Sequence, residues 1–196
     1  MPGTLQDARA ARGGYARTVM DSGLQRGYYP GMSEPRHAAT LIYAIMSGTG
    51  PATPLLERLA GEPLRVRALR SGVSELDGRD RGILGGTVAW WRDGVMETAG
   101  GVPLARTFLA LLPGGPVTGE VLAEIGTGTP AGTALPDLER GYQDALNVLG
   151  LPGWTGVAVS SRARLLHGGQ VIGYASELFP VTTCEWLAGR IAAPVT

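Results

Sequence analysis

The 196-residue sequence contains no lysine, so all 17 of its basic residues are arginines. A Schiff base needs a lysine amine, and a Walker-type phosphate loop needs its own lysine. The sequence therefore excludes lysine aldolases, pyridoxal-phosphate enzymes of the usual kind and P-loop nucleotide binding. Codon bias toward arginine, alanine and glycine is an alternative, non-functional cause of this composition, and the exclusions hold in either case.

Cysteine and histidine are almost as scarce, with one cysteine, Cys184, and two histidines, His37 and His167. One cysteine cannot form a disulfide within the chain, and these three residues cannot assemble a structural zinc site of the usual type. We expect Cys184 to be a small buried hydrophobic residue, with a reactive thiol at a helix start as the alternative. We expect no metal and no cofactor.

Neither sign of charge is in excess, since 17 acidic residues balance the 17 arginines. The sequence has no basic surplus that would indicate nucleic-acid binding. It has no run of 18 apolar residues, and no apolar stretch follows the N-terminal arginines as it would in a secretory signal. We therefore expect a cytoplasmic monomer or homodimer with neither a membrane nor a nucleic-acid partner.

The length and the 44% hydrophobic content fit one domain with its own core. Residues 1–35 contain glycines, prolines and charges without a sustained period. We expect this segment to be an N-terminal arm, either a poorly packed extension or a flap or partner contact. The domain itself is expected to cover residues 36–196.

Local patterns in that domain predict helices and long β-hairpins. The expected helices cover 36–47, 53–60, 117–125, 135–149 and 183–191, and the expected strands cover 64–70, 86–98, 102–112, 154–166 and 170–179. Thr53 is expected to cap its helix, with Pro54 in the first helical position. Hairpins in place of βαβ units predict an α+β fold, an antiparallel β-sheet of long hairpins with helices packed on one side.

The last hairpin carries the polar residues that first suggest a site. Counted back from a turn at Gly168-Gly169, the facing pairs are Arg164 with Gly173, Arg162 with Ala175, and Ser160 with Glu177. Arg162 and Glu177 are then diagonal neighbours on one polar face. The small residues beside them leave room for a ligand cavity. The alternative is an ordinary surface salt bridge, worth about 0–1 kcal/mol.

Two more candidate arginines lie in the preceding hairpin. Arg92 ends the apolar run at residues 88–91, where a guanidinium must find a partner or a solvated edge. Arg106 lies on the next strand, and a turn at Gly100-Gly101 places the two arginines on opposite faces unless a bulge intervenes. At most one of them should therefore share a cavity with Arg162.

Several short segments, in their order and spacing, resemble the chorismate pyruvate-lyase family. They are Trp91-Arg92, Ala105-Arg106-Thr107, Thr129-Pro130-Ala131-Gly132, residues 161–166 (SRARLL) and residues 176–180 (SELFP), with Thr53, Leu56 and Glu57 in the helix before the first strand. The resemblance spans about residues 50–182. It implies a chorismate lyase-like fold, an antiparallel sheet with flanking helices whose ligand is buried beneath flaps.

The same resemblance implies a cofactor-free lyase that eliminates pyruvate from chorismate to give 4-hydroxybenzoate. It makes Arg92 the residue that grips a ligand carboxylate and Glu177 the residue at the hydroxyl end, so both are catalytic candidates. Thr53 and Ala131 fall where the family uses backbone amides of its flaps. The substrate-binding candidates are Arg162, Arg164, Arg106, Thr53 and Ala131, and either Arg106 or Arg164 is the expected second carboxylate clamp.

Chorismate is a dianion, which an arginine-lined pocket suits. Two other functions remain open at this point. One is a repurposed family member that acts on another small anionic substrate in specialised metabolism. The other is a non-catalytic domain that binds or senses a small molecule.

Overall fold

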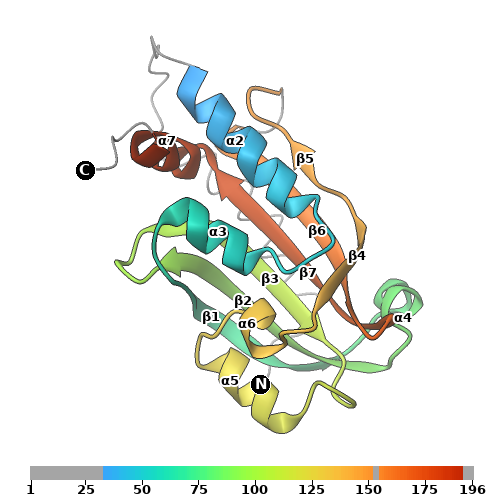
Figure 1. Ribbon diagram of the computed structural model, residues 1–196. Helices are drawn as coiled ribbons and strands as arrows, with labels where there is room; N and C mark the ends of the chain where they lie inside the picture. The colour runs from blue at the N-terminus through green and yellow to red at the C-terminus, as the bar shows by residue number, and fades with distance from the viewer. Residues whose placement is uncertain (1–32, 152–154, 192–196) are drawn as a thin grey trace.

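A seven-stranded antiparallel sheet forms the centre of the protein, whose computed structural model describes residues 33–151 and 155–191 (Figure 1). The strands are β1 (Leu64–Glu75), β2 (Val88–Thr98), β3 (Pro103–Leu111), β4 (Glu139–Gln143), β5 (Leu146–Asn147), β6 (Val157–His167) and β7 (Gln170–Pro180). They follow the order β1-β2-β3-β7-β6-β4, and β5 also pairs with β6. The α+β class and the antiparallel sheet of hairpins are therefore confirmed.

Five of the described helices pack on one face of this sheet (Figure 1). The helices are α2 (Ser33–Met46), α3 (Thr53–Ala60), α4 (Gly78–Leu84), α5 (Gly119–Gly126), α6 (Ala131–Ala134) and α7 (Val181–Ile191). The exception is α4, which covers stacked Trp91, Phe108 and Tyr174 on the opposite face. None of the helices in the described part of the chain has the length and apolarity needed to cross a membrane.

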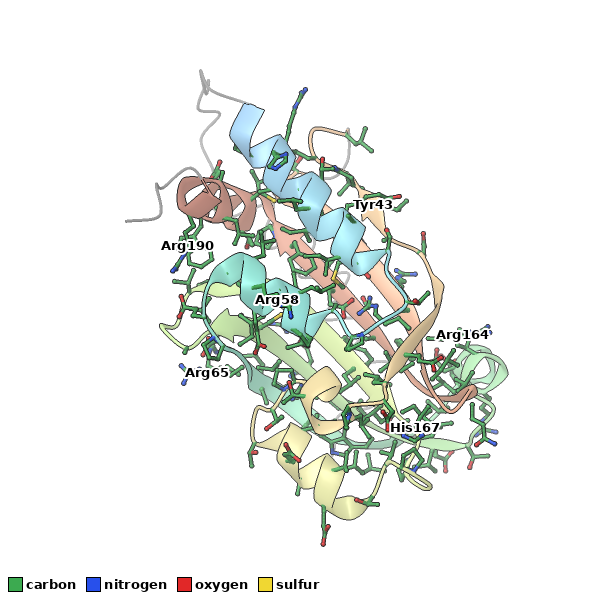
Figure 2. All side chains as sticks on the ribbon, viewed as in Figure 1. Tyr43, Arg58, Arg65, Arg164, His167 and Arg190 are labelled. Atoms are coloured by element: carbon green, nitrogen blue, oxygen red, sulfur yellow. The ribbon has the colours of Figure 1, made fainter. Side chains whose placement is uncertain are left out.

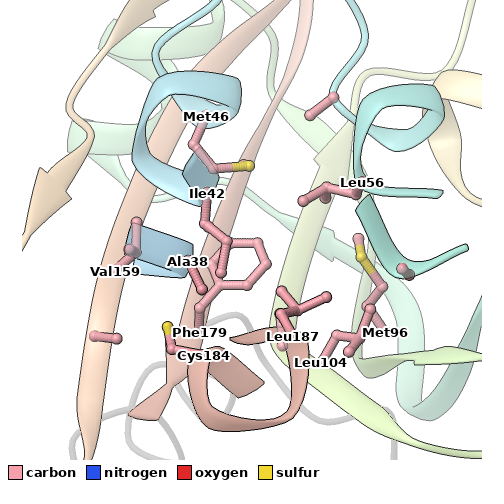
Figure 3. Close-up of a cluster of buried hydrophobic side chains, with 14 of the residues drawn as sticks. Ala38, Ile42, Met46, Leu56, Met96, Leu104, Val159, Phe179, Cys184 and Leu187 are labelled. Atoms are coloured by element: carbon pink, nitrogen blue, oxygen red, sulfur yellow. The ribbon is translucent and has the colours of Figure 1, made fainter. Parts of the chain in front are cut away.

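The helix-covered face of the sheet carries two hydrophobic clusters. The first packs α2, α3 and α7 against the sheet, and Figure 3 shows Ile42, Phe179 and Leu187 meeting within it. The second packs α5 and α6 through Ile125 and Leu135 against the middle of the sheet. The site described below lies between these clusters.

The local patterns placed most elements correctly. Helix α3 covers the predicted residues, and its apolar side buries Leu56 and Ala60 while Gly61 ends it in the left-handed conformation at φ 72°. The predicted cap is wrong, because Ala52 holds the N-cap position and makes no side-chain bond. Thr53 is instead the first helical residue. Of the expected N-terminal arm, residues 1–32 lie outside the described residues.

The predicted helix over residues 135–149 is wrong, because this segment forms β4 and β5. Its backbone pairs with other segments: the amide of Arg140 donates to the carbonyl of Thr49 at 2.7 Å. The amides of Asp144 and Arg162 each donate to the other's carbonyl, at 2.9 and 3.1 Å. These bonds to Thr49 and to the edge of β6 outweigh the helical spacing of leucines in the sequence.

The register predicted for the last hairpin is also wrong. The turn residues are correct, since His167 pairs with Gln170, but the register shifts between Leu165 and Leu166. Because side chains alternate along a strand, a one-residue bulge reverses every face beyond it. Ser161 therefore lies opposite Glu177 and Arg162 lies opposite Ser176, so Arg162 and Glu177 point to opposite faces.

Candidate functional site

A small cavity of about 60 Å³ lies between the sheet and the segments at residues 51–53 and 130–132. The strands contribute Arg92, Thr107, Leu109, Arg140 and Glu177 to its lining, among others. Three of the lining side chains are charged, two arginines and one glutamate, while the rest are apolar or neutral. The lining therefore carries one excess positive charge in its usual ionisation state, which suits a negatively charged ligand.

Arg92 projects from β2 into this cavity and is almost fully buried. Its Nη1 donates to the backbone carbonyl oxygens of Ile125 and Thr129, the latter at 3.3 Å. Its Nε has no hydrogen-bond partner, and no acidic side chain in residues 33–151 or 155–191 pairs with it. Burial lowers the pKa of Arg92 from 12.5 to about 10, because desolvation disfavours its charged form.

Glu177, on β7, is the other catalytic candidate, and it also lines the cavity. Its two carboxylate oxygens accept from Nη1 and Nη2 of Arg140, at 3.3 and 3.4 Å. Nη2 of Arg140 also donates to the hydroxyl of Ser161 at 2.9 Å. The side chains of this ion pair are only 5% and 9% exposed, so water screens their attraction far less than at a surface.

Strand register explains why these polar groups meet. Gly94, Thr107, Glu177 and Ser161 form one row across β2, β3, β7 and β6. This row separates the two hydrophobic clusters of the helix-covered face, with Met96 and Phe179 in one and Leu109 and Ala175 in the other. A polar row between two apolar clusters gives the cavity its mixed lining.

The segments that cover the cavity come from the start of α3 and from α6. Thr53 and Ala131 both line it. These segments lie close to one another: a Cβ on Gly132 would lie 3.3 Å from Oγ1 of Thr53.

Three predicted binding residues do not reach the cavity. Arg106 lies on the opposite face from Arg92, as predicted, and its Nε donates to Asp93 at 2.7 Å. Arg162 is exposed on that same outer face. Arg164 lies opposite Tyr174, and Figure 2 shows it near the turn of its hairpin, beside α4. Strand alternation explains all three placements: that of Arg106 counted from its turn, and those of Arg162 and Arg164 counted past the bulge.

Arg140 is the site residue that the sequence analysis missed. The helix predicted for its segment hid the alternation of buried Leu138 and Arg140 with exposed Glu139. Pro136 and Gly141 in the same stretch disfavour a helix and were the signal that pointed to a strand. A strand here would have placed Arg140 beside Leu138, on a buried face.

Metal and thiol chemistry find little support in the described residues. In residues 33–151 and 155–191, no group of three His, Cys, Asp or Glu side chains gathers that could hold a metal ion. Cys184 is fully buried, as expected, among the side chains of the first cluster (Figure 3). Burial, and to a lesser extent Glu185, raise the pKa of Cys184 to about 12, so its thiol stays protonated at neutral pH.

Comparisons with known proteins show a distant structural likeness. No protein-family profile and no curated protein matches the sequence. Among solved structures, the chain is similar to PhnF from Mycobacterium smegmatis, with a TM-score of 0.47 and 12% sequence identity over 68% of this chain. The match spans 65% of the length of that PhnF chain.

Proposed function

We propose that the protein is a cofactor-free lyase that binds chorismate and eliminates pyruvate from it to give 4-hydroxybenzoate. The observation that carries the proposal is Arg92, a buried guanidinium that faces a cavity and has no acidic partner among the described residues. Burying a positive charge away from water is unfavourable unless a negatively charged group of a ligand pairs with it. A planar carboxylate is the group that best fits a guanidinium.

The lining residues supply the groups that the elimination needs. Arg92 holds the ring carboxylate, and Glu177, which carries the only carboxylate among the lining side chains, lies across the sheet from it. In the reaction, Glu177 accepts the ring proton at the carbon that bears the hydroxyl. The electrons of that C–H bond form the new ring double bond, the neighbouring C–O bond breaks, and enolpyruvate leaves. The products are an aromatic ring and pyruvate.

The size of the cavity adds a step to this proposal. A volume of about 60 Å³ holds a few water molecules at most, whereas ligand pockets usually measure about 300–1,000 Å³. We therefore propose that the cavity widens before a ligand binds. Separation of residues 51–53 and 130–132 would admit the ligand, and bringing them together again would exclude water from the reaction.

Incubation of the purified protein with chorismate tests the proposal directly. We expect 4-hydroxybenzoate and pyruvate in equal amounts, measured by chromatography and a coupled pyruvate assay. Arg92→Gln should mainly raise KM, while Glu177→Gln should mainly lower kcat. A wild-type protein that makes no product above the background decay of chorismate would refute the lyase proposal.

A binding protein without catalysis is the second candidate, and one contact favours it. Both carboxylate oxygens of Glu177 already accept from Arg140, so Glu177 is held in an ion pair and is not free to face a substrate. For a pure binding protein, calorimetry should show tight binding of 4-hydroxybenzoate or chorismate without turnover. Other aryl carboxylates that bind better than chorismate would instead indicate a repurposed enzyme or sensor.

A further inference from the structure

We infer that Arg140 is the second anion-binding residue of this cavity, and that it exchanges Glu177 for a ligand carboxylate when a dianionic ligand binds. This inference rests on the proposed function only in that a small organic anion occupies the cavity. It assigns a specificity-determining role to a residue on β4, in place of the arginines on β3 and β6 that the sequence suggested.

The position of Arg140 matches this role. It approaches the cavity from β4, while Arg92 approaches from β2, and three strands separate them in the sheet. The two guanidinium groups therefore come to the cavity from opposite sides. Among the described lining residues they are the only cations. A ligand with one anionic group at each end fits this pair, whereas a monoanion engages only one of them.

Two kinds of side-chain contact made by Arg140 bear on this role. The bond from its Nη2 to the Ser161 hydroxyl measures 2.9 Å and comes from a neighbouring strand, so it fixes the guanidinium in place. The two bonds to Glu177 measure 3.3 and 3.4 Å, longer than the 2.7–2.9 Å usual for charge-assisted pairs. Ser161 therefore anchors Arg140, while Glu177 is the weaker contact that a ligand carboxylate can replace.

The test compares two rigid aromatic probes, terephthalate with two opposed carboxylates and benzoate with one, by isothermal titration calorimetry. We expect wild type to bind terephthalate more tightly. Arg140→Gln should weaken terephthalate about tenfold or more and benzoate less than about threefold, because only terephthalate loses a charge-assisted contact. Glu177→Gln should strengthen terephthalate binding, since Arg140 then has no competing carboxylate.

Two further variants show whether any loss comes from Arg140 itself. Arg162→Gln removes an exposed arginine on the outer face of β6 and should leave both affinities unchanged. Arg140→Lys keeps the charge but loses the planar fork, and should give an intermediate terephthalate affinity. If Arg140→Gln weakens both probes equally, or neither, the inference is wrong and Arg140 is a structural residue.

The outcomes also separate this inference from the lyase proposal. The Arg140-dependent preference for terephthalate without any turnover of chorismate rejects the lyase but supports the role of Arg140. Turnover of chorismate by a protein that lacks this preference supports the lyase but rejects the role of Arg140. A wild-type protein that binds neither probe overturns the inference.

Discussion

Arg92 places a positive charge where water does not reach it. Its pKa of about 10, against 12.5 in water, corresponds to a penalty of about 3 kcal/mol for keeping it charged. The bonds to the carbonyls of Ile125 and Thr129 offset much of that penalty. Such a residue is a poor choice for stability alone, and this is why we assign it to ligand binding.

Replacing Arg92 by methionine should therefore separate binding from stability. We expect Arg92→Met to weaken the binding of benzoate or chorismate at least tenfold, because the carboxylate loses its guanidinium. The free energy of unfolding should stay unchanged or rise by about 1 kcal/mol, since a desolvated charge is replaced by an apolar chain of similar length. Calorimetry and urea unfolding measure the two quantities, and a large loss of stability with unchanged binding would contradict this assignment.

The pH dependence of that stability difference has a definite sign. Below about pH 10, Arg92 is protonated in both the folded and the unfolded state, so the penalty is constant. Above about pH 10 the folded state loses the proton before the unfolded state does, so this group adds stability as the pH rises. The difference between Arg92→Met and wild type should thus be flat from about pH 6 to about pH 9.

The pair of Arg140 and Glu177 should behave as one unit. Glu177→Leu leaves a buried guanidinium without its carboxylate and should lower the free energy of unfolding by about 3–5 kcal/mol. Adding Arg140→Met should restore most of that loss, because the double variant removes both charges of the buried pair. Urea unfolding of the two single variants and the double variant gives the coupling energy. Strictly additive effects would show that the two side chains do not interact.

At the scale of elements, strand β7 depends on a glycine for close approach to β3. A Cβ on Gly173 would overlap the backbone carbonyl of Ala110, which has no freedom to move aside. A Cβ on Gly82, in α4, would instead meet open space. In the sequence, the small size of Gly173 suggests room for a ligand, but the neighbouring strand β3 occupies that space.

The same substitution at these two glycines should have opposite effects. Gly173→Ala should lower the free energy of unfolding by about 1–3 kcal/mol, the usual range for overpacking. Gly82→Ala should raise it by up to about 1 kcal/mol, because alanine favours the helix. Thermal and urea unfolding of both variants provide the comparison. A tolerated Gly173→Ala would mean that β3 and β7 are less closely paired than the structure shows.

Elements with strong local signals could be predicted from the sequence, and elements set by distant partners could not. Helix α3 carries Pro54 at its start, Gly61 at its end and one apolar side, all within its own residues. The segment of β4 and β5 has leucines at helical spacing, yet its bonds go to Thr49 and to β6. No local pattern reveals those partners, and the bulge at Leu165 is equally invisible in the sequence.

The candidate site shows the same division. Arg92, Glu177, Thr53 and Ala131 line one cavity. The strand patterns indicate Arg92 and Glu177 as candidates, whereas Thr53 and Ala131 follow from the resemblance alone. Counting residues from a turn fails after one bulge, so it selected Arg162, on the wrong face. Arg140 was missed because its segment was predicted to be a helix, and a wrong element type misplaces every residue in that element.

At the scale of the whole molecule, the site divides the helix-covered face into two parts of unequal size. The helices α2, α3 and α7, of 14, 8 and 11 residues, cover the first cluster. Only α5 and α6, of 8 and 4 residues, cover the second, and the loop between them reaches Arg92 through the carbonyl of Thr129. The lighter cover and its contact with Arg92 make this part the natural side for opening.

Hydrogen exchange should detect that opening. Without ligand, we expect the amides of α5 and α6 to exchange faster than those of α2 and α7, because short elements with little buried area open locally. A bound dianion joins Arg92 to Arg140 across the sheet and should protect α5 and α6 most. At a ligand concentration about 100 times Kd, the added stability is about 2.7 kcal/mol, which should raise Tm by about 5–10 °C. Protection confined to α2 and α7 would place the entrance on the other side of the cavity.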